Sequence, residues 1–111
     1  MNVEQKEIVL LPYPFTNQEG SKIRPALIVS NNFFNKKSDD CLAVPLTSVI
    51  KEELYSIFIT QEDLQFGTLI KPSRIRADKI FSIDKSKIIM KIGALNDETF
   101  QEVKSELFKV F

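Results

Sequence analysis

The sequence predicts a mainly β protein, a small antiparallel β-barrel with one C-terminal α-helix. Short apolar runs rich in β-branched residues recur between turn-forming segments, which is typical of small barrels. The final segment instead carries apolar residues at helical spacing behind a capping residue, which indicates a helix. No repeat or linker divides the 111 residues, so we expect a single domain over 1–111.

Seven apolar segments are expected to form the strands of this barrel. They are 8–11, 25–30, 42–46, 53–60, 68–75, 80–83 and 88–95. Pro72 cannot donate a ladder hydrogen bond, which indicates an edge or a bulge in its strand. The last two strands flank Asp84-Lys85-Ser86, and we expect them to pair as a hairpin.

Three polar segments are expected to connect the strands. Residues 14–21 are expected to form a loop, residues 31–40 a longer connection, and residues 61–67 a helical turn with a loop. Phe33 and Phe34 lie in the second segment, and we expect them in the core or in a dimer contact. The helix is expected over 97–110, with Asn96 as its N-cap and its apolar stripe against the sheet.

The composition excludes several classes of protein. The chain has no histidine, which excludes Ser-His-Asp and Cys-His catalysis, RNA cleavage by paired histidines and histidine metal sites. Cys41, the single cysteine, has no disulfide partner within the chain and is expected to be a small buried hydrophobe. No apolar run approaches the roughly 20 residues that span a bilayer, and no signal peptide is recognisable. We therefore expect a cytoplasmic protein that uses no membrane, metal or cofactor.

The charge is balanced overall but unevenly distributed. The 15 basic and 15 acidic residues give a net charge of zero, which argues weakly against nucleic-acid binding. Between Lys71 and Lys91, however, seven basic residues outweigh two acidic ones. A local field of this kind can steer an anion to the surface. A solvated charged face explains the same charges equally well.

Two stretches, 22–30 and 42–48, each join an apolar strand to a polar group at its end. Arg24 precedes the first apolar run, and Thr47 and Ser48 follow the second. A guanidinium matches two phosphate oxygens, and a threonine hydroxyl can donate to the same phosphate. We therefore hypothesise that these residues hold a phosphodiester. The alternatives are a surface ion pair for Arg24 and a strand-end turn for Thr47 and Ser48.

An ordered set of short motifs extends over nearly the whole chain. It consists of Ile8-Val9-Leu10, Pro14-Phe15-Thr16, Arg24-Pro25-Ala26-Leu27-Ile28-Val29-Ser30, Val44-Pro45-Leu46-Thr47-Ser48, Ile75-Arg76-Ala77-Asp78-Lys79-Ile80 and Ile83-Asp84-Lys85-Ser86. In this order and combination the motifs resemble the MazF/PemK family of toxins from type II toxin–antitoxin systems. Lys6-Glu7 departs from the Gly-Asp that many members carry before the first strand, so we expect a different turn there.

The resemblance implies an SH3-like barrel that forms a homodimer and acts as a ribosome-independent endoribonuclease. It implies cleavage of single-stranded mRNA without metal, leaving a cyclic phosphate and a free 5′-hydroxyl. The expected partner is an antitoxin encoded beside the toxin, which blocks the RNA groove. A cationic groove suits an acidic, initially disordered segment that folds on binding.

The resemblance also implies the catalytic residues. The family's arginine falls on Arg24, its threonine on Thr47, and an acidic residue found in some members on Glu19. Arginine rarely gives up its proton, since its pKa is above roughly 12, so Glu19 is one candidate for proton handling. The identity of the general base stays open, and a solvated loop residue is the alternative interpretation of Glu19.

Further residues are hypothesised to bind RNA. Phe15 and Thr16 lie on the first loop, where an aromatic ring can stack an unpaired base, although Phe15 also suits the core. A second group surrounds Pro72 or follows the catalytic threonine and is expected to bind phosphates or base edges. This group is Ser48, Lys71, Ser73, Arg74 and Arg76. Asp78 is an alternative partner for either arginine.

Two other functions remain open from the sequence. One is a barrel without catalytic activity that acts by protein contact, as related toxins do when they poison DNA gyrase, because fold does not determine function. The other is an inactive relic that retains only antitoxin binding. The recognised RNA bases depend on loop shape, which the sequence does not determine.

Overall fold

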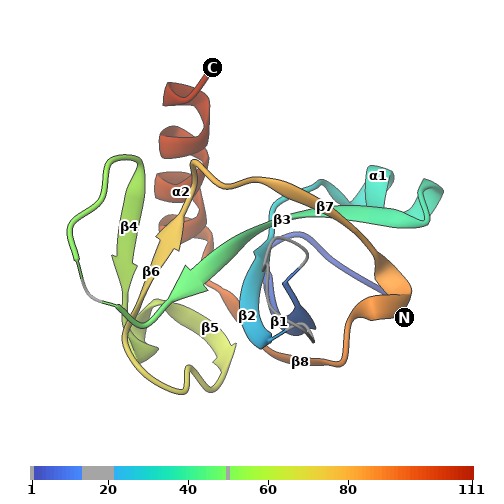
Figure 1. Ribbon diagram of the computed structural model, residues 1–111, viewed down its shortest axis with the longest axis horizontal. Coiled ribbons are helices and arrows are strands. Elements are labelled where there is room, and N and C mark those ends of the chain that lie inside the picture. Colours follow the sequence, from blue (N-terminus) through green and yellow to red (C-terminus); the bar gives the residue numbers. More distant parts are fainter. Residues whose placement is uncertain (1, 14–21, 50) are drawn as a thin grey trace.

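The computed structural model describes residues 2–13, 22–49 and 51–111. Eight strands in these residues form one antiparallel sheet in the order β4-β6-β3-β2-β1-β8-β5, with β7 paired to β3 beside that path. The strands are β1 (Glu7–Pro12), β2 (Ile23–Ile28), β3 (Asp40–Thr47), β4 (Ser56–Ile59), β5 (Leu64–Gly67), β6 (Ser73–Arg76), β7 (Phe81–Asp84) and β8 (Met90–Leu95). The sheet curls into a half-barrel with a C-terminal helix beside it (Figure 1). The predicted mainly β class is confirmed.

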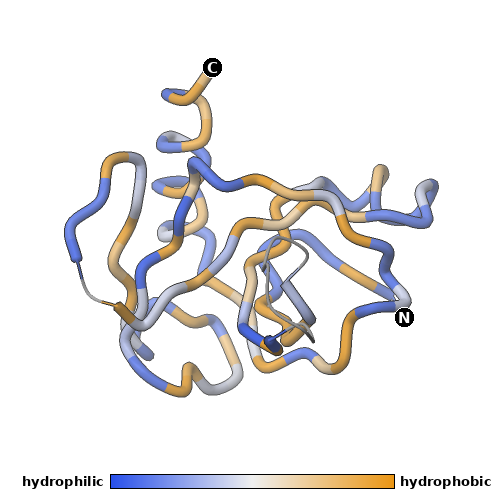
Figure 2. Tube along the Cα trace, viewed as in Figure 1, coloured by the Kyte–Doolittle hydropathy of each residue, from blue (hydrophilic) through white to orange (hydrophobic). Residues whose placement is uncertain are grey.

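Two α-helices and two short 3₁₀ turns complete the described elements. They are α1 (Asn32–Lys37), η1 (Gln61–Asp63), η2 (Lys85–Lys87) and α2 (Asp97–Lys109). Helix α2 confirms the predicted C-terminal helix, and the Asn96 side chain accepts the Thr99 N–H at 2.7 Å as its N-cap. Hydrophobic and hydrophilic residues alternate along α2 (Figure 2), and its buried residues include Phe100, Val103 and Leu107. The helix therefore covers the sheet with one apolar face.

The sheet separates two clusters of buried side chains. One cluster combines sheet residues such as Leu27 and Val44 with the apolar face of α2. The other lies on the opposite side of β3 and includes Ala26 and Ala43. Because successive strand residues point to opposite faces, neighbouring residues of β2 and β3 contribute to different clusters. Both strands are consequently buried on two faces over much of their length.

The predicted hairpin between 80–83 and 88–95 is wrong. Strand β7 pairs with β3, with Cys41 opposite Ile83, whereas β8 pairs with β1 and β5. The turn η2 separates β7 from β8, and Asp84 caps it by accepting the Ser86 N–H at 2.8 Å. The local turn signal was real, but it ends one strand without pairing it to the next.

Other predicted segments need smaller corrections. The connection 31–40 contains α1, because Asn31 accepts the Phe34 N–H at 2.8 Å and caps a helix there. Within 61–67 the helical turn is confirmed, but its second half is strand β5. The strands expected over 53–60 and 68–75 shorten to β4 and β6. Phe33 and Phe34 lie outside the core, with Phe33 73% exposed, so the core is the wrong one of their two predicted positions, and a dimer contact stays a prediction.

Cys41 is fully buried in β3, as predicted for a small hydrophobe. Burial raises the pKa of its thiol to about 11, so the reactive thiolate is scarce near neutral pH. Within the described parts of the chain, no helix combines the length and apolar character needed to cross a bilayer.

Lys6 has a backbone φ of 81°, in the left-handed region that favours glycine. Its N–H donates to the Ile28 carbonyl and its own carbonyl accepts the Leu95 N–H, both at 2.9 Å. These bonds tie the residue between β2 and β8, and its ammonium also pairs with Asp97. Lys6 therefore stands where many members of the resembled family have the glycine of Gly-Asp, and it adopts a backbone conformation suited to glycine.

We expect Lys6→Gly to be more stable than Lys6→Ala by about 1 kcal/mol, because only alanine retains the steric cost of a left-handed residue. Both variants lose the ion pair with Asp97, so that loss cancels in the comparison. Urea unfolding of the two variants measures the difference. An alanine variant as stable as the glycine variant would contradict the strain at this position.

Candidate active site

The site begins where the ladder between β2 and β3 ends. The last pair of that ladder is Ala26 with Pro45. The next residue of β2, Pro25, has no N–H to donate to the Leu46 carbonyl of β3, so it cannot extend the backbone hydrogen bonding. Carried two residues further, the same register sets Arg24 against Thr47. The two predicted catalytic residues thus come from facing ends of neighbouring strands.

The Tyr13 hydroxyl connects these two strand ends. It accepts the Leu46 N–H at 3.2 Å and lies within reach of the Leu46 carbonyl at 3.1 Å and of the Pro25 carbonyl. Tyr13 is 5% exposed, and this burial raises its pKa well above the ordinary value, against the smaller lowering effects of the Leu46 hydrogen bond and the Arg24 charge. The hydroxyl fills the place of the backbone bond that Pro25 cannot make.

Sequence reasoning missed Tyr13. Its position offered a signal, because Val9, Leu11 and Tyr13 fall on one face by strand alternation and belong to one buried cluster. A tyrosine on a buried face needs a partner for its hydroxyl. That partner could not be named without knowing which strand ends meet.

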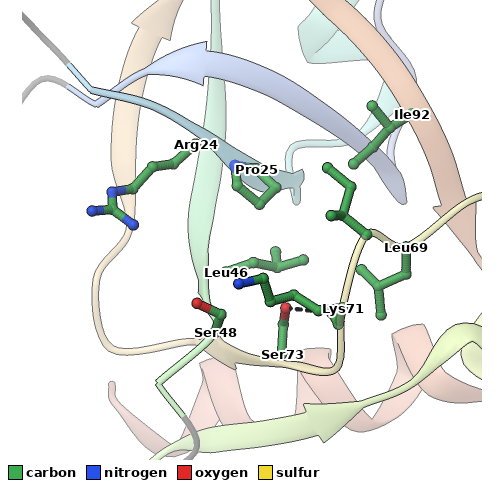
Figure 3. Close-up of a pocket in the computed structure, with 9 residues that line it drawn as sticks. Arg24, Pro25, Leu46, Ser48, Leu69, Lys71, Ser73 and Ile92 are labelled. Carbon is green, nitrogen blue, oxygen red and sulfur yellow. Dashed lines mark hydrogen bonds between the residues drawn. The ribbon is translucent and has the colours of Figure 1, made fainter.

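A cavity of about 120 Å³ opens beside Arg24 (Figure 3). Pro25, Leu46, Leu69 and Ile92 contribute apolar walls, and its polar groups are those of Arg24, Ser48, Lys71 and Ser73. The Lys71 amino group extends toward Ser48, while the Arg24 guanidinium projects outward from β2 (Figure 3). Buried Ser73 donates to the Lys71 carbonyl at 2.9 Å, which anchors the loop that carries Lys71. Ser48, Lys71 and Ser73 thus gather at one hollow, and Arg24 lines it with its guanidinium directed outward.

Thr47 faces a different set of residues. It ends β3 and lies directly opposite Arg74 of β6, which in turn lies opposite Phe58 of β4. Directly opposite residues in antiparallel strands share a face, so the three side chains form a row across three strands. The Thr47 Oγ1 accepts the Val49 N–H at 3.2 Å. The predicted strand-end turn is present, and the hydroxyl proton remains available to donate.

The arginines near the site differ in their ion pairing. Arg76 binds Asp78 through two hydrogen bonds of 3.0 and 2.9 Å, which holds the pKa of Asp78 below its usual range. Neither Arg24 nor Arg74 has a carboxylate within 4.0 Å among the described residues. Arg24 and Arg74 are therefore better placed than Arg76 to meet an external anion.

The basic run 71–91 does not form one surface. Lys85 donates to the Asn35 carbonyl at 2.6 Å, on the α1 side of the molecule, and Lys91 pairs with Glu7 at 3.0 Å. The positive groups near the cavity and the row are Arg24, Lys71 and Arg74. The remaining predicted site residues, Phe15, Thr16 and Glu19, lie outside the described residues.

Comparison with solved structures shows the same fold in other proteins. The chain is 19% identical to a structure titled "Endoribonuclease in complex with its cognate antitoxin from Mycobacterial species", with a TM-score of 0.79 over 97% of this chain and 93% of that one. It is 22% identical to a MazE–MazF crystal structure from Deinococcus radiodurans, with a TM-score of 0.77 over 99% and 96% of the two chains. These likenesses define the class of fold, a small curled β-sheet with a C-terminal helix.

Sequence comparison gives the family. The family described as "PemK-like, MazF-like toxin of type II toxin-antitoxin system" matches residues 4–111, so the chain belongs to that family. A relative named Endoribonuclease EndoA, from Bacillus subtilis (strain 168), is 26% identical over 94 residues, which are 85% of this chain and 80% of that protein. The family predicted from the ordered motifs is confirmed.

We expect Tyr13→Phe to lower the free energy of unfolding by about 1–3 kcal/mol, because it leaves a buried N–H of Leu46 without its acceptor. Tyr55→Phe, at a half-buried residue outside both buried clusters, is a suitable control. Urea unfolding of both variants checks the difference. Equal stability of Tyr13→Phe and the wild type would contradict a stabilising role of the Tyr13 hydroxyl at these strand ends.

The difference in stability between the wild type and Tyr13→Phe should depend on pH. The pKa of Tyr13 is raised on folding, so its contribution is fully present below its unfolded pKa of about 10 and is lost as the pH rises beyond that value. The stability advantage of the wild type over Tyr13→Phe should therefore shrink from about pH 9 to about pH 11. A constant difference across that range would contradict burial of a protonated hydroxyl.

Proposed function

We propose that this chain is the toxin component of a type II toxin–antitoxin system and cuts single-stranded RNA. The observation that carries the proposal is that Arg24 and Thr47 directly neighbour Pro25 and Leu46, the backbone positions that Tyr13 joins across β2 and β3. Arg24 has no carboxylate within 4.0 Å among the described residues. Relatives named as endoribonucleases support the same enzyme class. They do not favour the alternative of a barrel that acts by protein contact alone.

The proposed reaction is attack by the 2′-hydroxyl of the RNA on its own phosphodiester, giving a cyclic phosphate and a free 5′-hydroxyl. Arg24 stabilises the charge that develops on the phosphorus oxygens, since its fork matches two of them. Thr47 donates a hydrogen bond to the same group. A nucleophile that belongs to the ribose explains a restriction to RNA. Glu19 is the proposed acceptor of the 2′-hydroxyl proton, and return of that proton to the departing 5′-oxygen gives the free 5′-hydroxyl.

The proposal includes partners and compartment. Solved relatives contain a cognate antitoxin or a MazE chain, which supports an antitoxin as the partner of this toxin. An acidic antitoxin segment suits the positive groups of Arg24, Lys71 and Arg74. We propose that residues 1–111 act as one toxin domain, in a cytoplasmic homodimer, and the family match over 4–111 supports that extent.

We expect wild-type protein to cut a mixed pool of single-stranded RNA in EDTA, and Arg24→Ala to lose about 10²-fold or more in rate, as for removal of an oxyanion contact. Arg24→Lys keeps the charge but loses the fork, so its rate should fall between the two. Mapping the cut ends by sequencing, with an assay for cyclic phosphate, identifies the products.

Lys22→Ala is the matched control, because it removes an exposed positive charge two residues from Arg24. It should retain most of the wild-type rate. If Arg24→Ala cuts as fast as Lys22→Ala, Arg24 has no part in the reaction. Intact RNA with gyrase subunits captured instead would support the protein-contact alternative.

A further inference from the structure

The row that begins at Thr47 ends at an aromatic ring on the outer strand of the sheet. Thr47, Arg74 and Phe58 lie directly opposite one another on β3, β6 and β4. Opposite residues are about 5 Å apart, so Phe58 lies about 10 Å from Thr47. A nucleotide that follows or precedes a phosphate held at Thr47 can reach this ring.

Phe58 is oriented away from the core of the protein. Its neighbour Ile59 is fully buried, whereas 43% of the surface of Phe58 is exposed. A single exposed aromatic side chain is common on protein surfaces and is not a site by itself. The residues around the ring indicate that it can bind a ligand.

Arg74 lies over the ring with its guanidinium carbon 5.9 Å from the ring centre. One guanidinium nitrogen donates to the Ser56 hydroxyl at 3.3 Å, which holds the side chain across β4. Among the described residues it has no carboxylate partner, in contrast to Arg76 two residues along the same strand. A flat cation and an aromatic ring therefore stand together, with positive charge that no acidic side chain neutralises.

We propose that Phe58 and Arg74 form a stacking platform for an unpaired base of single-stranded RNA, next to the phosphate held by Arg24 and Thr47. Aromatic rings and guanidinium planes are the surfaces on which proteins stack splayed bases, and the arginine also attracts the neighbouring phosphate. This inference rests on the proposed function and extends it by a base-binding position that lies on the sheet, away from the loops.

The test measures RNA binding separately from cleavage. Fluorescence anisotropy in EDTA follows binding of a short RNA whose nucleotide at the mapped cut carries no 2′-hydroxyl, or of the mixed RNA pool if no cut occurs. Phe58→Leu should bind about tenfold more weakly, within the range for loss of one stacked base. Phe66→Leu, at an exposed phenylalanine on the opposite end strand β5, should bind as the wild type does.

A second variant and a second substrate sharpen the result. Arg74→Gln should weaken binding and reduce the slope of log affinity against log salt by about one. When the base beside the cut is replaced by an abasic site, the difference between wild type and Phe58→Leu should disappear. A loss that is the same for intact and abasic RNA would overturn the platform, as would unchanged affinity in both variants.

The outcomes separate this inference from the proposed function. Wild-type protein that binds RNA without cutting it overturns the nuclease, while Phe58→Leu still tests the platform on the same titration. Wild-type protein that neither binds nor cuts overturns both. Variants that keep RNA affinity but lose affinity for the cognate antitoxin assign the surface to a protein partner and overturn the platform. Circular dichroism melts confirm that each variant is folded.

Discussion

The register of strand β3 is the constraint on which the rest of the molecule depends. The strand bonds to β2, β6 and β7, and its alternate side chains enter two different buried clusters. A shift by one residue would exchange the two sets of side chains and place buried groups in the wrong cluster. The register that packs both clusters therefore also determines which face Thr47 presents, so the position of the site follows from the packing.

Pro25 interrupts the backbone hydrogen bonding between β2 and β3 at the edge of the site. Without further backbone bonds the strand ends would separate, but Tyr13 supplies a hydroxyl that fills the gap. The site thus lies at a place where the sheet opens and is held by one side chain. Arg24 stays paired with Leu11 of β1 and Thr47 with Arg74 of β6, so each keeps its place in the sheet.

Local patterns in the sequence were sufficient for β1, β2, β3 and α2, because each has a long apolar run or a capped amphipathic stripe. Strand β5 and the partner of β7 could not be predicted, since they depend on contacts between residues distant along the chain. The same distinction applies to the site. Arg24 and Thr47 could be found from their positions at strand ends and from the order of the family motifs. The role of Tyr13 comes from hydrogen bonds to residues distant along the chain, and that of Phe58 from cross-strand register.

The deep position of Cys41 gives the protein a built-in reporter. Its thiol lies in β3, opposite Ile83 of β7, and no other cysteine in the chain competes for a label. A thiol reagent reaches it only when the strand leaves its place, so labelling kinetics follow the opening of the sheet in the unmodified protein. A ligand that binds both β2 and β3 would slow this opening and therefore the labelling. The labelling rate of Cys41 thus reports how much of the protein has ligand bound at the site.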